Sequence, residues 1–249
     1  VENVIRESSG VNLPREVEQA RKEVNRGCAE MVDWVKARSE GLLQQGKLPA
    51  VLGGDHSCAL GLIQALSDRS HEFGILHIDA HLDLRESYQK FPFSHASIMF
   101  NALQCRGVRK LVQVGIRDYS SEEVETASKN RARIHLVEGR RLWRRRFRGA
   151  SWGNLCREII AHLPQDVYVS FDMDGLDVSL CPSSGTPAPG GLMFEEALFL
   201  IDEVVFYKEN SLSRRKLSDE RQRIRDRGHR YSFKLCRQPI HLLRRLDLA

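Results

Sequence analysis

No stretch of this sequence is apolar over the roughly 20 residues that a membrane-spanning helix needs. The first residues, Val1–Ile5, have neither the basic region nor the apolar region of a secretory signal, and no initiator methionine precedes them. We therefore expect a cytoplasmic protein with no membrane partner, and an amino end that is truncated.

Cysteine pairs of the C-x-x-C type are also missing. The six cysteines are scattered, which in a chain of this size favours reduced cytosolic thiols over a disulfide framework. No internal repeat and no linker divides the 249 residues, and 41% of them are hydrophobic, enough for a substantial core. Length alone leaves one large domain or two small ones open.

Acidic residues are scarce only near the end of the chain. Residues 210–249 hold 12 Lys/Arg and 4 Asp/Glu, whereas residues 1–209 hold 26 and 29, so the net charge of +5 comes from a basic carboxyl-terminal segment. That segment lacks interleaved aromatics and any known nucleic-acid-binding module. The basic run Arg140–Arg148 is interpreted as a solvated face or an oligomer contact. We expect no nucleic-acid partner.

Short apolar runs alternate with helical patterns along the chain. Strands are expected at residues 48–54, 74–79, 110–117, 134–137 and 167–172. Helices are expected at residues 14–46, 58–66, 94–104, 121–129, 151–162 and 194–206. This alternation predicts an α/β fold with a parallel sheet that helices cover on both faces.

Polar side chains follow three of these strands at the point where each strand ends. They are His56, then Asp79, His81 and Asp83, then Asp172 and Asp174. Ligands of open α/β sheets bind beyond the carboxyl ends of the strands, and residues two apart point to the same side. Four carboxylates and two imidazoles exceed the needs of one divalent ion. The sequence therefore predicts two ions that activate a water for hydrolysis.

One more histidine lies beside this set. His77 is two residues before Asp79 within the expected strand. We interpret it as a packed core histidine, with support of a metal ligand as the alternative.

Four segments of the chain resemble the ureohydrolases, the arginase and agmatinase family. Three are similar to the family signatures and the fourth to the turn after the third signature: Gly53–Ser57, Asp79–Asp83, Ser170–Asp177 and Thr186–Gly191. The resemblance covers residues 15–206. It implies a three-layer α/β/α domain with a parallel sheet, usually of eight strands. It also implies a homo-oligomer that hydrolyses guanidino or formimino C–N bonds of small molecules, commonly releasing urea.

The resemblance further implies the roles of the polar residues. The ligands of two Mn²⁺ ions would be His56, Asp79, His81, Asp83, Asp172 and Asp174. An oxygen-rich set suits a hard ion such as Mn²⁺ better than Zn²⁺ or Cu²⁺. Two cations make hydroxide available at neutral pH, which the poorly electrophilic guanidinium carbon requires. His95, in Phe93–Ser97, matches the family histidine that shuttles a proton.

Two positions bear on the substrate. Arginase-type members have a small polar residue where this chain has Arg85, which could pair with a substrate carboxylate or brace a carboxylate ligand. Asp118, just after the strand at 110–117, is a candidate contact for a cationic group. We expect agmatine, which would yield putrescine, with formiminoglutamate and arginine as the alternatives.

The chain also departs from the family pattern. The family's first strand is missing, and active members follow their last strand with a Glu-Val-x-Pro-like segment whose glutamate holds the guanidinium. Here Ser232–Pro239 would place Arg237 at that position, and a cation would repel the substrate. We therefore expect an arginase-like domain at residues 1–206, incomplete at both ends, and a divergent basic segment at 207–249. A metal-binding but catalytically impaired homologue is the alternative function.

Overall fold

The protein, known here from a computed structural model, is described over residues 14–69, 72–213 and 231–236. These residues form a six-stranded parallel sheet in the order β1-β6-β5-β2-β3-β4. The strands are β1 (Ala50–Gly53), β2 (Phe73–Ile78), β3 (Val108–Ile116), β4 (Ile134–Glu138), β5 (Val167–Phe171) and β6 (Tyr231–Cys236). The predicted α/β class with a parallel sheet is confirmed.

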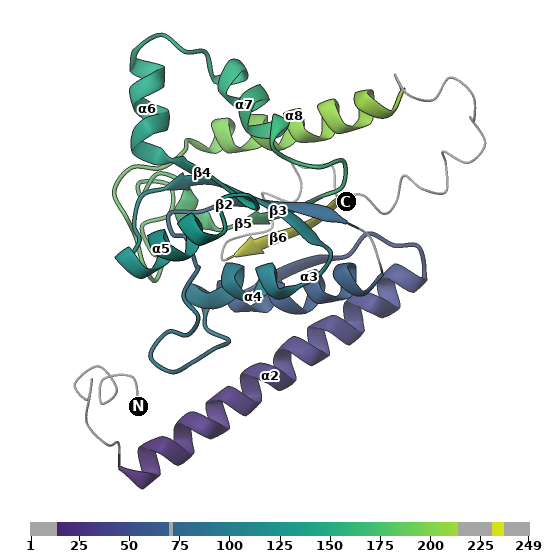
Figure 1. Cartoon of the computed structure of the whole chain (residues 1–249), viewed down its shortest axis with the longest axis vertical. Coiled ribbons are helices and arrows are strands. Elements are labelled where there is room, and N and C mark those ends of the chain that lie inside the picture. The colour runs from purple at the N-terminus through teal and green to yellow at the C-terminus, as the bar shows by residue number, and fades with distance from the viewer. Residues whose placement is uncertain (1–13, 70–71, 214–230, 237–249) are drawn as a thin grey trace.

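Helices cover both faces of the sheet, so that the molecule has three layers (Figure 1). The first face is covered by α2 (Arg15–Gln44), α3 (Ala59–Asp68), α4 (Ile98–Gln104) and α5 (Ser121–Lys129). The second face is covered by α6 (Gly139–Phe147), α7 (Trp152–Ala161) and α8 (Phe194–Ser213). Three-residue turns of 3₁₀ helix begin at His56, His95 and Met173.

The core consists of two apolar clusters, one on each side of the sheet. Successive residues of β2 point to opposite faces, so Ile75 packs in the cluster under α2, α3 and α4, and Leu76 in the cluster under α7 and α8. Every residue of β2 and of β5 is buried, as expected for central strands covered on both faces. These two rigid neighbours carry most of the polar residues at their carboxyl ends.

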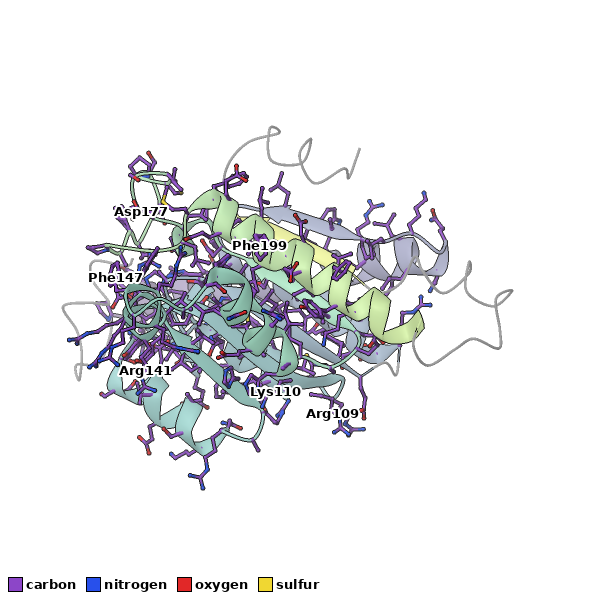
Figure 2. All side chains as sticks on the ribbon, turned by 90° about the horizontal axis from the view of Figure 1, so that it is seen from above. Arg109, Lys110, Arg141, Phe147, Asp177 and Phe199 are labelled. Atoms are coloured by element: carbon purple, nitrogen blue, oxygen red, sulfur yellow. The ribbon has the colours of Figure 1, made fainter. Side chains whose placement is uncertain are left out.

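Helix α6 is the one described helix that lies wholly outside the helices expected from the sequence. It occupies most of the basic run Arg140–Arg148, and besides Gly139 only its Leu142 is buried. The Arg146 guanidinium lies 5.2 Å from the centre of the Trp143 ring and 5.5 Å from that of Trp152, which connects the helix to α7. Arg141 and Phe147 point outward (Figure 2). Arginines make up more than half of α6 and a single apolar residue enters the core, so the segment was interpreted from the sequence as a basic run rather than as a helix.

The end of the described chain is part of the same sheet. Helix α8 runs through residue 206, where the sequence predicted a boundary, and continues to Ser213. Strand β6, from the predicted basic segment, lies between β1 and β5. Arg237 falls outside the described residues.

The described helices give no sign of a membrane segment. None of them combines the length and the apolar character that crossing a bilayer would take.

Candidate metal centre

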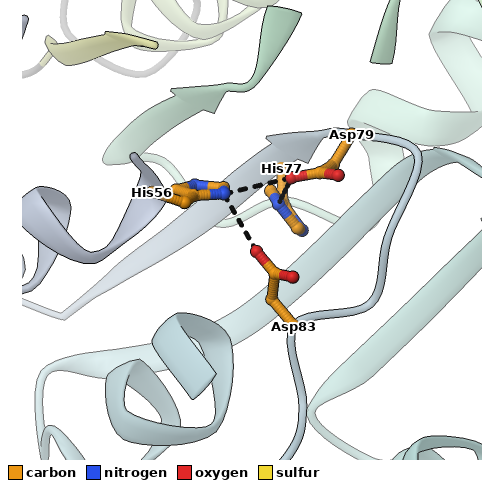
Figure 3. A group of neighbouring side chains, drawn as sticks. All are labelled: His56, His77, Asp79 and Asp83. Carbon is orange, nitrogen blue, oxygen red and sulfur yellow. Dashed lines mark hydrogen bonds and ion pairs between the residues drawn. The ribbon is translucent and has the colours of Figure 1, made fainter. Parts of the chain in front are cut away.

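The carboxyl ends of β1, β2 and β5 bring three predicted carboxylate ligands around one nitrogen of the His56 imidazole. Nδ1 of His56 lies 3.0 Å from Oδ2 of Asp83, 3.1 Å from Oδ2 of Asp79 and 3.5 Å from Oδ2 of Asp172. Figure 3 shows one nitrogen of the His56 ring facing both Asp79 and Asp83. Residues far apart in the sequence thus converge at one edge of the sheet, as expected for the end of a parallel sheet.

The orientation of His56 depends on a residue that the sequence analysis did not single out. Nε2 of His56 lies 2.7 Å from Oγ of Ser170, near the end of β5. This contact turns Nδ1 towards the carboxylates. Ser170 is fully buried and lies two residues before Asp172, so its position on the same side of the strand was the available signal.

A second group of donors lies beside the first. Nδ1 of His81 is 3.3 Å from Oδ1 of Asp79 and 3.3 Å from Oδ2 of Asp174. The two groups share Asp79, whose Oδ2 faces His56 and whose Oδ1 faces His81. One carboxylate is therefore common to both groups of candidate metal ligands.

His77 supports the shared carboxylate, which corrects its interpretation as packing alone. Its Nε2 lies 2.8 Å from Oδ2 of Asp79, and its Nδ1 lies 3.0 Å from Nε2 of Gln113. Because the Gln113 amide nitrogen can only donate, Nδ1 of His77 accepts and Nε2–H donates to Asp79. Both ring nitrogens are thus engaged, which favours orientation of Asp79 over direct binding of an ion.

Charge crowding dominates the electrostatics of the site. Burial, with the neighbouring charge of Asp79, raises the pKa of Asp83 and raises that of Asp174 to about 7. Burial also opposes ionisation of Asp79, but hydrogen bonds from His56, His77 and His81 outweigh it and hold that pKa well below its usual range. For His81, burial is outweighed by hydrogen bonds to Asp174 and Asp79, which raise its pKa to about 11.

This donor set fits divalent cations. Asp79, Asp83 and Asp174 are 1%, 5% and 7% exposed, so their mutual repulsion is poorly screened. A bound cation would relieve that repulsion, and carboxylate oxygens with a few imidazole nitrogens are the ligands of hard ions such as Mn²⁺. The His and Asp clusters can therefore hold metal.

Asp83 reaches the site through an unusual backbone conformation. Its φ is 54°, in the left-handed region that few non-glycine residues adopt. Its carbonyl oxygen accepts hydrogen bonds from the N–H groups of Met99 and Phe100 at the start of α4. The side chain can thus face His56 while the main chain caps a helix. Such conformations concentrate at functional sites.

The histidine predicted to shuttle protons lies on a neighbouring turn. The turn His95–Ser97 packs against the turn His56–Cys58. The His95 ring is half-buried and meets the Tyr88 ring edge-on, with 5.8 Å between the ring centres. Tyr88 therefore orients His95 from the side of the loop that follows Asp83.

The two predicted substrate contacts lie at different places around the site. Arg85 forms a 3.5 Å ion pair with Glu123 of α5 and lies 5.1 Å from the centre of the Tyr88 ring. It thus braces α5 against this loop, and its described ion pair is not with a predicted ligand. Asp118 is 68% exposed, and its Oδ2 is 3.6 Å from Nε2 of His81, at the outer rim of the second group.

Asp177, the last residue of the third signature, braces a turn. Its Oδ1 accepts hydrogen bonds from the N–H and the hydroxyl of Ser179, at 3.0 Å and 2.6 Å. It lies on the loop that leaves the site, away from the main body of the sheet (Figure 2).

Comparisons with known proteins agree with this arrangement. The sequence model of the arginase family matches residues 17–213. N(1)-aminopropylagmatine ureohydrolase of Thermus thermophilus is 38% identical over 205 residues, which are 78% of this chain and 66% of that protein. Agmatinase of Pyrococcus horikoshii is 34% identical over 194 residues, 78% of this chain and 59% of that protein.

A solved structure shows the same fold. The agmatine ureohydrolase of Thermoplasma volcanium aligns with a TM-score of 0.64 at 24% identity, over 86% of this chain and 62% of that one. This chain spans about two thirds or less of the length of each of these three proteins. Since the family model matches most of the chain, and its signature residues lie together at one end of an arginase-type sheet, this chain belongs to the arginase family.

Proposed function

We propose that this chain is a two-manganese ureohydrolase that cleaves a guanidino C–N bond and releases urea, with agmatine as the substrate and putrescine as the second product. The observation that carries the proposal is the pair of donor groups that share Asp79. His56, Asp83 and Asp172 would hold one ion with Asp79, and His81 and Asp174 would hold the other. Bound ions would lower the pKa of a water so that hydroxide is available at neutral pH.

The protein's own residues would perform the remaining steps. Asp79 accepts hydrogen bonds from His77 and from the N–H of His81, and so holds the two donor groups at a fixed distance from each other. His95 is proposed to deliver a proton to the leaving amine, because collapse of the tetrahedral intermediate requires that the amine leave in neutral form. Tyr88 limits the orientations open to that ring.

The choice of agmatine rests on charge at the outer rim. Agmatine carries an ammonium group at the end opposite its guanidinium. Asp118, exposed and next to His81, is an acidic group suited to such a tail. The names of the similar proteins point the same way, since they are an agmatinase and an aminopropylagmatine ureohydrolase. Arg85 forms an ion pair with Glu123. This weakens the argument for formiminoglutamate or arginine, because Arg85 would have to bind the carboxylate of such a substrate.

The proposal extends to the setting of the enzyme. Free thiols are found at Cys28, Cys58, Cys105, Cys156 and Cys181, which supports a cytoplasmic location. We propose a homo-oligomer acting on a small molecule, with neither nucleic acid nor membrane as a partner.

The test is urea release from agmatine by the purified chain, with and without added Mn²⁺, together with its metal content. Manganese-dependent urea with two ions bound is the expected result. Aminopropylagmatine, arginine and formiminoglutamate would be assayed in parallel, the last by formamide release. Turnover of arginine or formiminoglutamate alone would contradict the assignment of agmatine as the substrate. An absence of bound metal would contradict the metal-dependent mechanism.

A second candidate is a metal-binding homologue that does not turn over substrate. It is favoured by one sequence observation: the residues after Val205 lack the Glu-Val-x-Pro-like segment that holds the guanidinium in active members. Two bound Mn²⁺ ions without product from any of the four substrates would select this alternative.

A further inference from the structure

The side chain of Arg117 donates hydrogen bonds to an unusually large number of main-chain carbonyl groups. It follows β3 directly and is only partly exposed. Its guanidinium donates to five carbonyl oxygens, at these distances: Asp174 2.7 Å, Ala188 2.9 Å, Leu176 3.1 Å, Pro189 3.1 Å and Gly115 3.3 Å. The planar fork of an arginine can satisfy several acceptors in fixed directions at once.

These acceptors lie on two different loops. Asp174 and Leu176 belong to the loop that follows β5, and Ala188 and Pro189 to the turn before α8. The main-chain N–H of Arg117 also donates to the carbonyl oxygen of Ala80, between Asp79 and His81. A single residue thus ties together the three segments that surround the second donor group.

The turn before α8 in its own right touches a proposed metal ligand. The hydroxyls of Ser184 and Thr186 donate to Oδ2 of Asp174, at 3.4 Å and 3.3 Å. Gly191, with φ of 127°, packs so closely on the main chain of Leu176 that a Cβ would overlap it. The position of this turn therefore helps to set the direction in which Asp174 points.

The charge of Arg117 adds a second effect. Burial lowers the pKa of the guanidinium, while the charges of Asp174 and Asp79 raise it, and an arginine stays protonated in proteins. Because its described hydrogen bonds go to carbonyl oxygens, the cation offsets nearby negative charge without occupying the carboxylate oxygens that face His81. Those oxygens stay available for a metal ion.

We propose that Arg117 is a positioning residue that sets the affinity of the second donor group, Asp79, His81 and Asp174, for its ion. The inference rests on the proposed metal centre. Arg117 acts through the main chain of Asp174 and through the turn that carries Thr186. Its donors are directed to carbonyl groups, so it holds the site in shape and does not itself bind substrate.

The test compares Mn²⁺ binding isotherms, measured from the electron paramagnetic resonance signal of free Mn²⁺. Arg117→Met should lower the affinity for one of the two Mn²⁺ ions on the order of 10- to 100-fold, the usual cost of losing a group that orients a ligand. The affinity for the other ion should stay nearly unchanged. Arg117→Lys should not restore it, because a point-like ammonium cannot reach carbonyls on both loops.

Arg133→Met is the matched control. Arg133 is also partly buried, and it also donates to two main-chain carbonyls, that of Leu103 in α4 and that of Val108 at the far end of β3. This variant should lower the melting temperature without shifting the Mn²⁺ isotherm. Thr186→Val should lower the affinity for the same Mn²⁺ ion as Arg117→Met does. Because Thr186 is exposed, this variant still tests the proposal if the Arg117 variants do not fold.

The outcomes separate the two proposals. Wild-type protein that binds no Mn²⁺ overturns the metal centre, and this inference with it. Wild-type protein that binds two ions, with unchanged isotherms for Arg117→Met and Thr186→Val, overturns the role of Arg117 alone. An equal loss of affinity for both ions would also contradict the role of Arg117, since that would indicate a general loss of structure.

Discussion

At the scale of single residues, the centre depends on side chains that touch the predicted ligands from outside. Ser170 contacts His56, and His77 contacts Asp79. Both lie in strands, two residues before a predicted ligand, and both are fully buried. A buried polar group is costly unless it is hydrogen-bonded, so their presence in central strands indicates a role at the site.

Replacing His77 with Leu should weaken Mn²⁺ binding by about 10- to 100-fold, because Asp79 loses the donor that orients it. Loss of the hydrogen bonds to Asp79 and Gln113 should also lower the free energy of unfolding by about 1–3 kcal/mol. Isothermal titration and urea denaturation measure the two effects. His135→Leu in β4 is the control, and Mn²⁺ affinity equal to that of this control would contradict the role of His77.

Uptake of metal should release protons. Without metal, hydrogen bonds to Asp174 and Asp79 raise the pKa of His81 to about 11, so the ring is protonated at pH 7.5, and Asp174, with a pKa of about 7, is partly protonated. Ligands bind metal in the deprotonated form, so affinity should fall as pH decreases and rise as pH increases towards 11. Calorimetry at pH 7.5 in buffers of different ionisation enthalpy should show about one proton released or more. Heats independent of the buffer would exclude this.

At the scale of helices, strands and loops, the close approach of two loops defines the centre. A Cβ added to Gly175, in the turn after β5, would lie 2.8 Å from the main-chain nitrogen of Asp79 and 3.0 Å from its Cα. Both atoms belong to the main chain of a buried strand end and have little freedom to move. The absence of a side chain at Gly175 therefore allows the loops after β2 and β5 to meet.

Gly175→Ala should lower the free energy of unfolding by about 1–3 kcal/mol, the usual cost of overpacking, and should weaken metal binding by displacing Asp79. Urea denaturation with a parallel Mn²⁺ titration measures both. Gly185→Ala is the control, because no atom lies within 4 Å of the Cβ it would gain. Equal stability of the two variants would show that the loops can separate without cost.

Many of the strands and helices were predictable from the sequence. Apolar runs located β2, β3 and β5, whereas the approach of Asp83 to His56 depends on a left-handed backbone conformation beyond the end of β2, which the spacing of the residues does not predict. Helix α6 was not predicted, because it is held by Leu142 and by contacts of the Arg146 guanidinium with the rings of Trp143 and Trp152. Nor were the contacts of Arg117 with the turn at residues 188–189, since no local pattern encodes a contact between such distant residues.

At the scale of the whole molecule, the metal-free centre is a source of instability. Three buried carboxylates lie close together, and two of them have a raised pKa because ionisation there is unfavourable. Ions that bind only the folded protein would stabilise it by mass action.

Saturation with Mn²⁺ should therefore raise the melting temperature. Free Mn²⁺ at 100 times the dissociation constant adds about 2.7 kcal/mol for each site, and a chain of this size gains roughly 2–4 °C for each kcal/mol. Removal of metal with a chelator should reverse the shift in a thermal denaturation assay. In Asp83→Ala the shift should be smaller, and an equal shift in that variant would contradict metal binding at His56 and Asp83.

The position of β6 has a consequence for the order of folding. Residues 231–236 are the last described segment of the chain, yet they separate β1 from β5, and β6 is the described partner of β1 in the sheet. Strand β1 leads directly to His56, whose ring must reach Ser170 on β5. During synthesis, β2 to β5 can pair as they emerge, whereas β1 has to wait for β6, which is made after all the other described strands. Such non-local pairing is intrinsically slow, so the imidazole of His56 would join its carboxylate partners only after β6 has been made.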